Sequence, residues 1–204
     1  MTARLSNEGL SASSRQRAPP LAPQRIALLT SVPSSALADM LRTAKERWPL
    51  TELLVIPIPV QGDVAPKICS VLERLAQQVE SLRVNAVVLA RGGGSREDLM
   101  VFDDEVLCRT LAHFPVPVVT GLGHEDDLTV ADLVADFRAA TPTAAIVSLL
   151  PTRSAALQFL SQCRRQLLQS QIWRLRREEE RLIQRRDALI QASPTAVVGR
   201  RRER

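Results

Sequence analysis

The sequence contains no tyrosine, and aromatic residues make up only 3% of its 204 residues. Its three cysteines, Cys69, Cys108 and Cys163, lie far apart and match neither a disulfide framework nor the spacing of a zinc site. They fit a reducing cytoplasm, and we expect all three to be small buried hydrophobic residues. No apolar run approaches the roughly 20 residues of a membrane-spanning helix, and the first residues lack the apolar centre of a secretory signal. The sequence therefore predicts a cytoplasmic globular protein that does not enter a membrane.

The charge balance is basic, with 27 Lys and Arg against 22 Asp and Glu. Most of the excess lies in the C-terminal third, which is rich in arginine from Arg164 to Arg204. Such a segment suits a polyanionic partner such as nucleic acid. Charge alone fits a solvated helical face equally well.

Apolar runs alternate with amphipathic segments along most of the chain. The predicted strands are 25–31, 53–60, 85–90 and 116–121, and the predicted helices are 35–48, 64–83, 97–113 and 128–137. The prolines within 53–60 favour an edge strand or a strand end. This alternation predicts an α/β fold, with a mostly parallel sheet in a flavodoxin- or Rossmann-like arrangement of three layers.

The chain divides into four parts by composition. Residues 1–24 are rich in Ser, Arg and Pro and predict a disordered leader, and 25–152 hold the α/β domain. Residues 153–192 read as one long helix, and 193–204 as a frayed basic tail. Leucines recur every seven residues in this helix, at Leu168, Leu175, Leu182 and Leu189, with Ile172 in the same stripe. The repeat predicts a coiled coil with a partner helix; the alternative is a single amphipathic helix that folds back on the domain.

Two glycine-rich turns follow predicted strands, and the first contains Arg91, Gly92, Gly93, Gly94 and Ser95. Consecutive glycines do not fit the Rossmann fingerprint, and no lysine follows to make a P-loop. Glycines nevertheless let backbone N–H groups approach an anion closely, and an arginine can hold a phosphate with two hydrogen bonds. Ser95 together with Glu97 or Asp98 can instead cap the following helix.

The second turn contains Gly123, His124 and Asp127. An imidazole with a carboxylate three residues later can work as an oriented general acid or base, or the pair can be half of a metal site. No second histidine lies nearby, which excludes the zinc motif with two histidines on one helix. Because the carboxyl ends of parallel strands meet at one edge of a sheet, both turns should lie together there.

The segment after the second turn carries Asp136 and Arg138, which can pair with each other or line the site. Thr141 followed by Pro142 is typical of a helix start, with threonine as the cap and proline in the first turn. Asp39 lies on the first predicted helix, and its spacing alone indicates only an exposed helix acid.

Three stretches occur together and in order: IPVQG at 58–62, RGGGSREDLMVFDDE at 91–105, and PVPVVTGLGHEDDLTVADLVADFRAATPTAA at 115–145. In combination they closely resemble the large subunit of exodeoxyribonuclease VII, over residues 25–152. The resemblance implies a nuclease catalytic domain that cuts single-stranded DNA from either end into short oligonucleotides. It also implies a complex with several copies of a small helical subunit, bound through the C-terminal helix.

The family's functional positions carry over to Asp39, Arg91, His124 and Asp127, each of which is retained. The resemblance implies that no cofactor is required, although Mg²⁺ can take part. Arg91 and the backbone of the glycine turn would bind the scissile phosphate, and His124 would act as general base or acid. Asp127 would orient His124 or, with Asp39, bind water or a metal ion.

The sequence also departs from the family pattern. An N-terminal oligonucleotide-binding domain is usual in the family, whereas here a short polar leader precedes the first strand, and the helical extension is shorter. Four usual residues are replaced, by Met100, Asp103, Asp126 and Val147. Two rival functions follow: a non-catalytic assembly or DNA-binding relative of the subunit, and a small-molecule enzyme whose glycine turns bind a nucleotide phosphate.

Overall fold

The computed structural model describes residues 2–59, 64–92, 96–123 and 128–192. Several predicted site residues lie outside this part of the chain: Gly93, Gly94, Ser95, His124 and Asp127, as does the basic tail 193–204. The chain forms two compact units, Met1–Arg153 and Ser154–Arg204.

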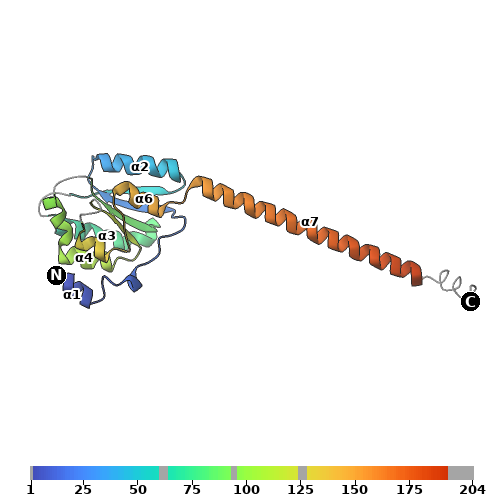
Figure 1. Ribbon diagram of the computed structural model, residues 1–204. Coiled ribbons are helices and arrows are strands. Elements are labelled where there is room, and N and C mark those ends of the chain that lie inside the picture. The colour runs from blue at the N-terminus through green and yellow to red at the C-terminus, as the bar shows by residue number, and fades with distance from the viewer. Residues whose placement is uncertain (1, 60–63, 93–95, 124–127, 193–204) are drawn as a thin grey trace, which may run out of the picture. The chain divides into compact units, whose positions relative to one another are not determined.

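The first unit is built on a parallel sheet of five strands (Figure 1). The strands are β1 (Arg25–Thr30), β2 (Glu52–Pro57), β3 (Ala86–Ala90), β4 (Val118–Gly121) and β5 (Phe137–Arg138). Their order in the sheet is β2-β1-β3-β4-β5, the order of flavodoxin-like folds. The predicted α/β fold with a parallel sheet is therefore confirmed. β2 lies at an edge and ends at Pro57, so both alternatives that its prolines allowed are met, because proline cannot donate to a neighbouring strand.

Helices cover both faces of the sheet, which gives three layers (Figure 1). They are α2 (Ser35–Arg47) and α6 (Pro142–Leu149) on one face, and α3 (Ala65–Leu82) and α4 (Glu105–Ala112) on the other. Alternate residues of each strand supply the two cores. Leu89 of β3 packs in the α3 and α4 layer, whereas Val88 packs in the α2 and α6 layer. The central strands are buried on both sides, which explains why they read as unbroken apolar runs.

Two of the predicted helices are shorter than expected. Residues 97–113 divide into a 3-10 segment, η2 (Arg96–Asp103), and α4, whose N-cap is Asp104. The Asp104 carboxylate accepts the Leu107 N–H at 2.9 Å and caps α4, whereas the predicted cap by Ser95 together with Glu97 or Asp98 involves residue 95, which lies outside the described residues. The predicted helix 128–137 ends early, as α5 (Val130–Val134), and is followed by β5. The predicted helix start at Thr141 is confirmed, since its hydroxyl accepts the Ala144 N–H at 3.1 Å.

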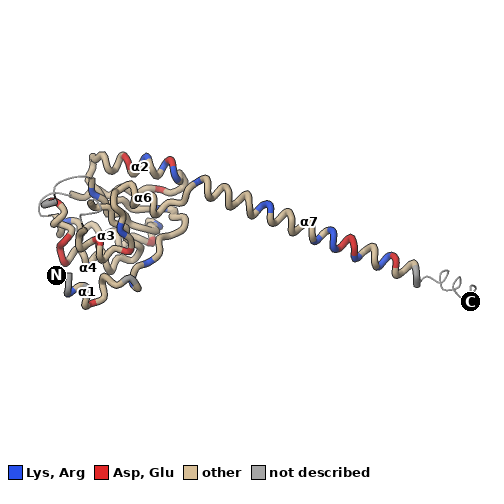
Figure 2. The backbone as a smooth tube through the Cα atoms, viewed as in Figure 1, with Lys and Arg blue, Asp and Glu red and all other residues tan. Residues whose placement is uncertain are grey.

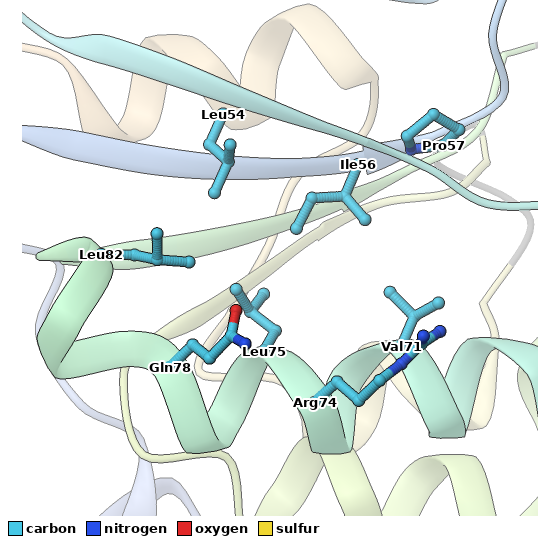
Figure 3. Close-up of a pocket in the computed structure, with 8 residues that line it drawn as sticks. All are labelled: Leu54, Ile56, Pro57, Val71, Arg74, Leu75, Gln78 and Leu82. Atoms are coloured by element: carbon cyan, nitrogen blue, oxygen red, sulfur yellow. The ribbon is translucent and has the colours of Figure 1, made fainter.

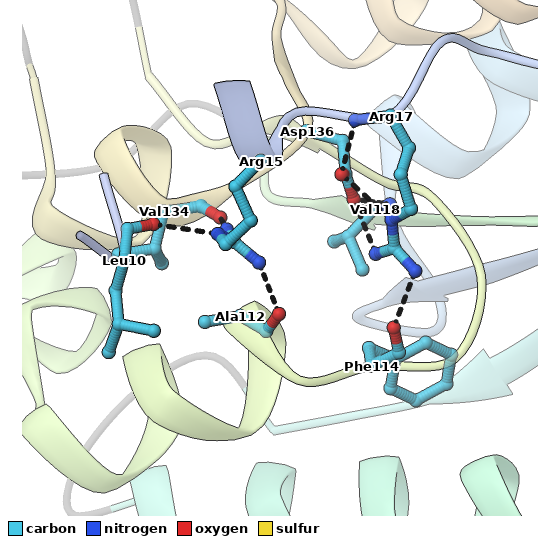
Figure 4. A network of polar contacts seen from close by, with 8 residues as sticks. All are labelled: Leu10, Arg15, Arg17, Ala112, Phe114, Val118, Val134 and Asp136. Atoms are coloured by element: carbon cyan, nitrogen blue, oxygen red, sulfur yellow. Dashed lines mark hydrogen bonds and ion pairs between the residues drawn. The ribbon is translucent and has the colours of Figure 1, made fainter. Parts of the chain in front are cut away.

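The N-terminal segment differs from the predicted disordered leader. It contains α1 (Thr2–Asn7) and a short 3-10 turn, η1 (Ser13–Arg15), and the side chains of Leu5 and Leu10 are buried in the core shared with α3 and α4. The Arg15 guanidinium donates to the carbonyls of Leu10, Ala112 and Val134 (Figure 4). A polar composition therefore coexists with a fixed path, because Leu5, Leu10, Arg15 and Arg17 provide the contacts.

The second unit consists mainly of α7 (Arg153–Ala192), which matches the predicted long helix. The predicted heptad leucines are exposed, from 54% at Leu168 to 72% at Leu189. Arginines alternate with acidic residues along the second half of the helix (Figure 2). Cys163 is only partly buried, unlike Cys69 and Cys108, so the expectation of three buried cysteines holds for two of them. None of the described helices is long and apolar enough to cross a membrane.

Gly121 shows how tightly the sheet packs where β4 ends. A Cβ atom at this position would lie 3.0 Å from the Thr141 carbonyl oxygen and 3.1 Å from the Pro142 Cα, both of them backbone atoms. We expect Gly121→Ala to lower the free energy of unfolding by about 1–3 kcal/mol, because the backbone has to move apart. Denaturant unfolding measures this loss, and an unchanged midpoint would show that β4 and α6 do not pack this closely.

Candidate active site

The candidate site lies at the carboxyl ends of β1 and β3, where the strand order reverses. In flavodoxin-like sheets ligands bind outside this point. Ser34 caps α2 after β1, accepting the Leu37 N–H at 3.2 Å. Gly92 follows β3, and a Cβ atom there would lie 3.3 Å from the Ala36 Cβ. The first glycine turn therefore begins directly against the first turn of α2, and the missing side chain permits that approach.

Arg91 links β3 to its neighbours and is almost fully buried, with 4% of its side chain exposed. Its backbone N–H donates to the Gly121 carbonyl at 3.1 Å, which extends the pairing of β3 with β4. Its guanidinium donates to the Asp98 carboxylate at 2.5 Å. A buried guanidinium with a charged partner keeps a fixed orientation, so Asp98 orients Arg91.

Asp39 lies one helical turn beyond Ala36 on α2. Its side chain is 46% exposed, and it forms an ion pair with Arg42 at 2.7 Å. Among the described residues the structure thus places Asp39 one turn from the glycine turn without joining it to Arg91. The residue keeps the exposed helical position that its spacing alone indicated.

Arg138 lies on β5 and forms an ion pair with Asp132 of α5, with 3.8 Å between Nε and Oδ2. The same Asp132 oxygen accepts the Thr129 N–H at 3.1 Å and the Thr129 hydroxyl at 2.9 Å. Asp136 pairs instead with Arg17 at 2.7 Å. The predicted alternative in which Asp136 pairs with Arg138 is therefore wrong.

The residues on either side of 124–127 are anchored. Gly123 follows β4, and Leu122 just before it is buried. On the other side Thr129 caps α5, and the Val130 N–H donates to the Asp103 carboxylate of η2 at 2.7 Å. Asp103 stands where the family usually has another residue, and here its carboxylate joins η2 to the start of α5.

Sequence reasoning missed Asp132 and Thr120. Asp132 is buried near Arg138, and Thr120 is fully buried at the end of β4. The Thr120 hydroxyl and one Asp132 oxygen lack a hydrogen-bond partner within the described part of the chain. The spacing of Thr129 and Asp132 is that of a capping box, which could have identified Asp132 as a structural residue but not as the partner of Arg138.

Two other features do not belong to this site. A pocket of about 460 Å³ lies between β2 and α3, at the opposite edge of the sheet from β5, and is lined mainly by apolar residues such as Leu54, Ile56 and Leu75 (Figure 3). Within the described ranges, no three His, Cys, Asp or Glu residues are grouped closely enough to hold a metal ion.

Comparison with known proteins shows the family of the chain. A family model described as "Exonuclease VII, large subunit" matches residues 10–204. The chain is 61% identical over 201 residues to the exodeoxyribonuclease 7 large subunit of Synechococcus sp. (strain CC9311), covering 98% of this chain and 52% of that relative. It is 64% identical over 191 residues to the protein of the same name from Parasynechococcus marenigrum (strain WH8102), covering 94% and 49%.

A more distant relative carries the same name. The exodeoxyribonuclease 7 large subunit of Moorella thermoacetica (strain ATCC 39073 / JCM 9320) is 45% identical over 161 residues, which cover 78% of this chain and 39% of that relative. The chain spans about half the length of the cyanobacterial relatives it matches. The chain belongs to the family of exonuclease VII large subunits.

Proposed function

We propose that this chain supplies the catalytic domain of an exodeoxyribonuclease that hydrolyses single-stranded DNA to short oligonucleotides. One observation carries the proposal: Arg91 is buried and oriented by Asp98 where β3 ends, beside the close approach of Gly92 to α2. A guanidinium held in one orientation where a parallel strand ends suits a phosphate. Family membership and the retained residues Asp39, His124 and Asp127 support hydrolysis of a phosphodiester bond at that phosphate.

In this mechanism Arg91 holds the scissile phosphate and stabilises the negative charge that develops in the transition state. His124 takes a proton from the attacking water or gives one to the leaving oxygen, and Asp127 orients His124. The arginines of α7 attract the DNA backbone. No cofactor is required in this proposal; a bound Mg²⁺ would supply further charge stabilisation.

The direct test is replacement of His124 by alanine. We expect cleavage of end-labelled single-stranded DNA to fall by about 10²–10⁴-fold, since a general acid or base usually contributes that much. His113→Ala is the matched control, because His113 is the other histidine of the chain and is exposed at the end of α4. Each protein is assayed with and without a chelator and with and without a small-subunit partner.

The outcomes separate the candidate functions. Cleavage by the wild type and by His113→Ala, but not by His124→Ala, supports the nuclease. A chelator effect would show that a metal ion takes part. A folded wild-type chain that cleaves under none of these conditions would favour the non-catalytic assembly protein.

We further propose that the small subunit of exodeoxyribonuclease VII binds α7. The support is the stripe of exposed apolar residues on a basic helix, with Leu175 at 69% and Leu182 at 66% exposure. We expect Leu175→Glu together with Leu182→Glu to abolish co-purification with the small subunit while the thermal unfolding of the α/β domain is unchanged. Retained binding would place the partner elsewhere.

The free, widely spaced cysteines support a cytoplasmic site of action.

A further inference from the structure

Arg91 and Arg138 emerge on the same face of the sheet at the same edge. Val87 and Leu89 of β3 both pack in the α3 and α4 layer, so Arg91, two residues further, points to that side. Arg138 pairs in register with Thr120, whose neighbour two residues earlier, Val118, belongs to the same layer. The two arginines therefore share one face, with β4 between them.

Each arginine is held by a carboxylate from an element that covers this face. Arg91 pairs with Asp98 of η2, and Arg138 pairs with Asp132 of α5. η2 and α5 are joined by a different carboxylate, because the Val130 N–H of α5 donates to Asp103 of η2. The arginines and their carboxylates thus lie on one face of the sheet, at the carboxyl ends of β3 and β5.

The two arginines lie on strands that are separated only by β4. Neighbouring strands lie about 4.8 Å apart, so the backbones of β3 and β5 are roughly 10 Å apart. Arg91 is 4% exposed, whereas the Arg138 side chain is 32% exposed. The Arg91 guanidinium is therefore fixed deep in the site. The Arg138 side chain reaches solvent, where a DNA strand bound by Arg91 would continue.

Polar groups are buried beneath Arg138 at an energetic cost. The Asp132 side chain is 2% exposed, and one of its oxygens has no hydrogen-bond partner among the described residues; the same is true of the buried Thr120 hydroxyl. A buried polar atom without a hydrogen-bond partner is unfavourable. Packing alone does not favour such groups, which points to a functional role for this part of the sheet.

We propose that Arg138, positioned by Asp132, binds the phosphate next to the one held by Arg91. This proposal rests on the proposed nuclease function and deepens it, because it makes two consecutive charged phosphates the unit that the site recognises. Asp132 is a positioning residue: it acts through Arg138 and does not touch the DNA.

The test uses end-labelled single-stranded oligonucleotides that carry one neutral methylphosphonate linkage, and it measures cleavage at the linkages on each side. For the wild type we expect a neutral neighbour on one side to lower cleavage about tenfold to hundredfold, the effect of one hydrogen bond between charged groups. Arg138→Ala should lower cleavage of the all-phosphate strand by the same factor and lose the discrimination. Asp132→Asn should raise KM more than it lowers kcat and weaken the discrimination.

Arg74→Ala is the matched control, because Arg74 lies on α3 beside the pocket at the other edge of the sheet, and it should keep the full discrimination. Thermal unfolding of each variant checks that the fold is retained. The proposal is overturned if the neutral linkage slows Arg138→Ala by the same factor as it slows the wild type. Independent effects add in free energy, so that result would show that Arg138 does not bind the linkage. It is also overturned if Asp132→Asn tightens DNA binding, the result expected when Asp132 contributes only repulsion.

A failure of the proposed nuclease function would give a different result from a failure of the second phosphate site. A wild type that cleaves no all-phosphate strand would contradict the nuclease proposal alone. The same set of variants and oligonucleotides would then be compared by dissociation constant. A wild type that binds both kinds of strand equally would contradict the second phosphate site itself.

Discussion

Replacing Arg91 by alanine should lower the rate of DNA cleavage by about 10³-fold or more, the contribution that arginines make when they stabilise charge on a transferring phosphoryl group. The structure explains the size of this effect. The guanidinium is 4% exposed and bonded to Asp98 at 2.5 Å, so the protein has already met the cost of orienting it before DNA arrives. Steady-state cleavage of a labelled single strand measures the loss.

Two controls separate catalysis from stability. Arg91→Lys keeps the positive charge but loses the planar fork, so we expect it to lose most of the activity while unfolding closer to the wild type. Arg74→Ala removes an exposed arginine and should keep full activity. If Arg91→Ala cleaves at the wild-type rate, or if Arg91→Lys restores that rate, the guanidinium is not the group that holds the phosphate.

Asp136→Ala should lower the free energy of unfolding by about 2–4 kcal/mol, because it leaves the Val118 N–H without its acceptor and breaks an ion pair with the partly exposed Arg17. The Asp136 side chain is 1% exposed and accepts from the Arg17 guanidinium at 2.7 Å, from the Arg17 N–H at 2.8 Å and from the Val118 N–H at 2.8 Å (Figure 4). The Arg17 guanidinium also donates to the Phe114 carbonyl at 2.7 Å. One carboxylate therefore joins the N-terminal segment to the start of β4, and its loss frees both.

The pH dependence of stability should show the same contact. Burial by itself raises the pKa of Asp136, but hydrogen bonds from the Arg17 side chain, the Val118 N–H and the Arg17 N–H lower the pKa below its ordinary value. Because the folded state binds the proton less readily than the unfolded state, this stability is present above a pH of about 3.9 and is lost as the pH falls further, through the folded pKa.

Denaturant unfolding between pH 7 and pH 3 tests both statements. Asp136→Ala should lose stability at pH 7 and lose less on acidification than the wild type does. Asp187→Ala is the control, since Asp187 is an exposed carboxylate that pairs with Arg186 on α7 and should change stability by less than about 1 kcal/mol. Equal stabilities of wild type and Asp136→Ala at pH 7 would show that the N-terminal segment is not held by this ion pair.

The sequence predicted the central architecture because strand and helix periodicities are local. The runs at 25–31, 85–90 and 116–121 became β1, β3 and β4, since strands buried on both faces are apolar throughout. The glycine turn after β3 was found for the same reason: it follows directly on such a run. The part of the candidate site that contains Arg91 and Gly92 could therefore be predicted from the sequence.

Local patterns failed where long-range contacts decide. Arg138 lies on β5, a strand of two residues that is too short to show a hydrophobic period. β5 is extended because it pairs with β4. The N-terminal segment is polar, yet Arg15 and Arg17 reach carbonyls about a hundred residues away. No window of sequence contains both ends of these bonds.

By itself, then, the sequence determined the parallel sheet, the long helix and the motifs that mark the family. Only the tertiary structure decided which charges pair: Asp98 with Arg91, Asp132 with Arg138, and Asp136 with Arg17. Periodicity follows from the geometry of one element, whereas the choice among several nearby carboxylates depends on how separate elements pack and on which charges that packing buries.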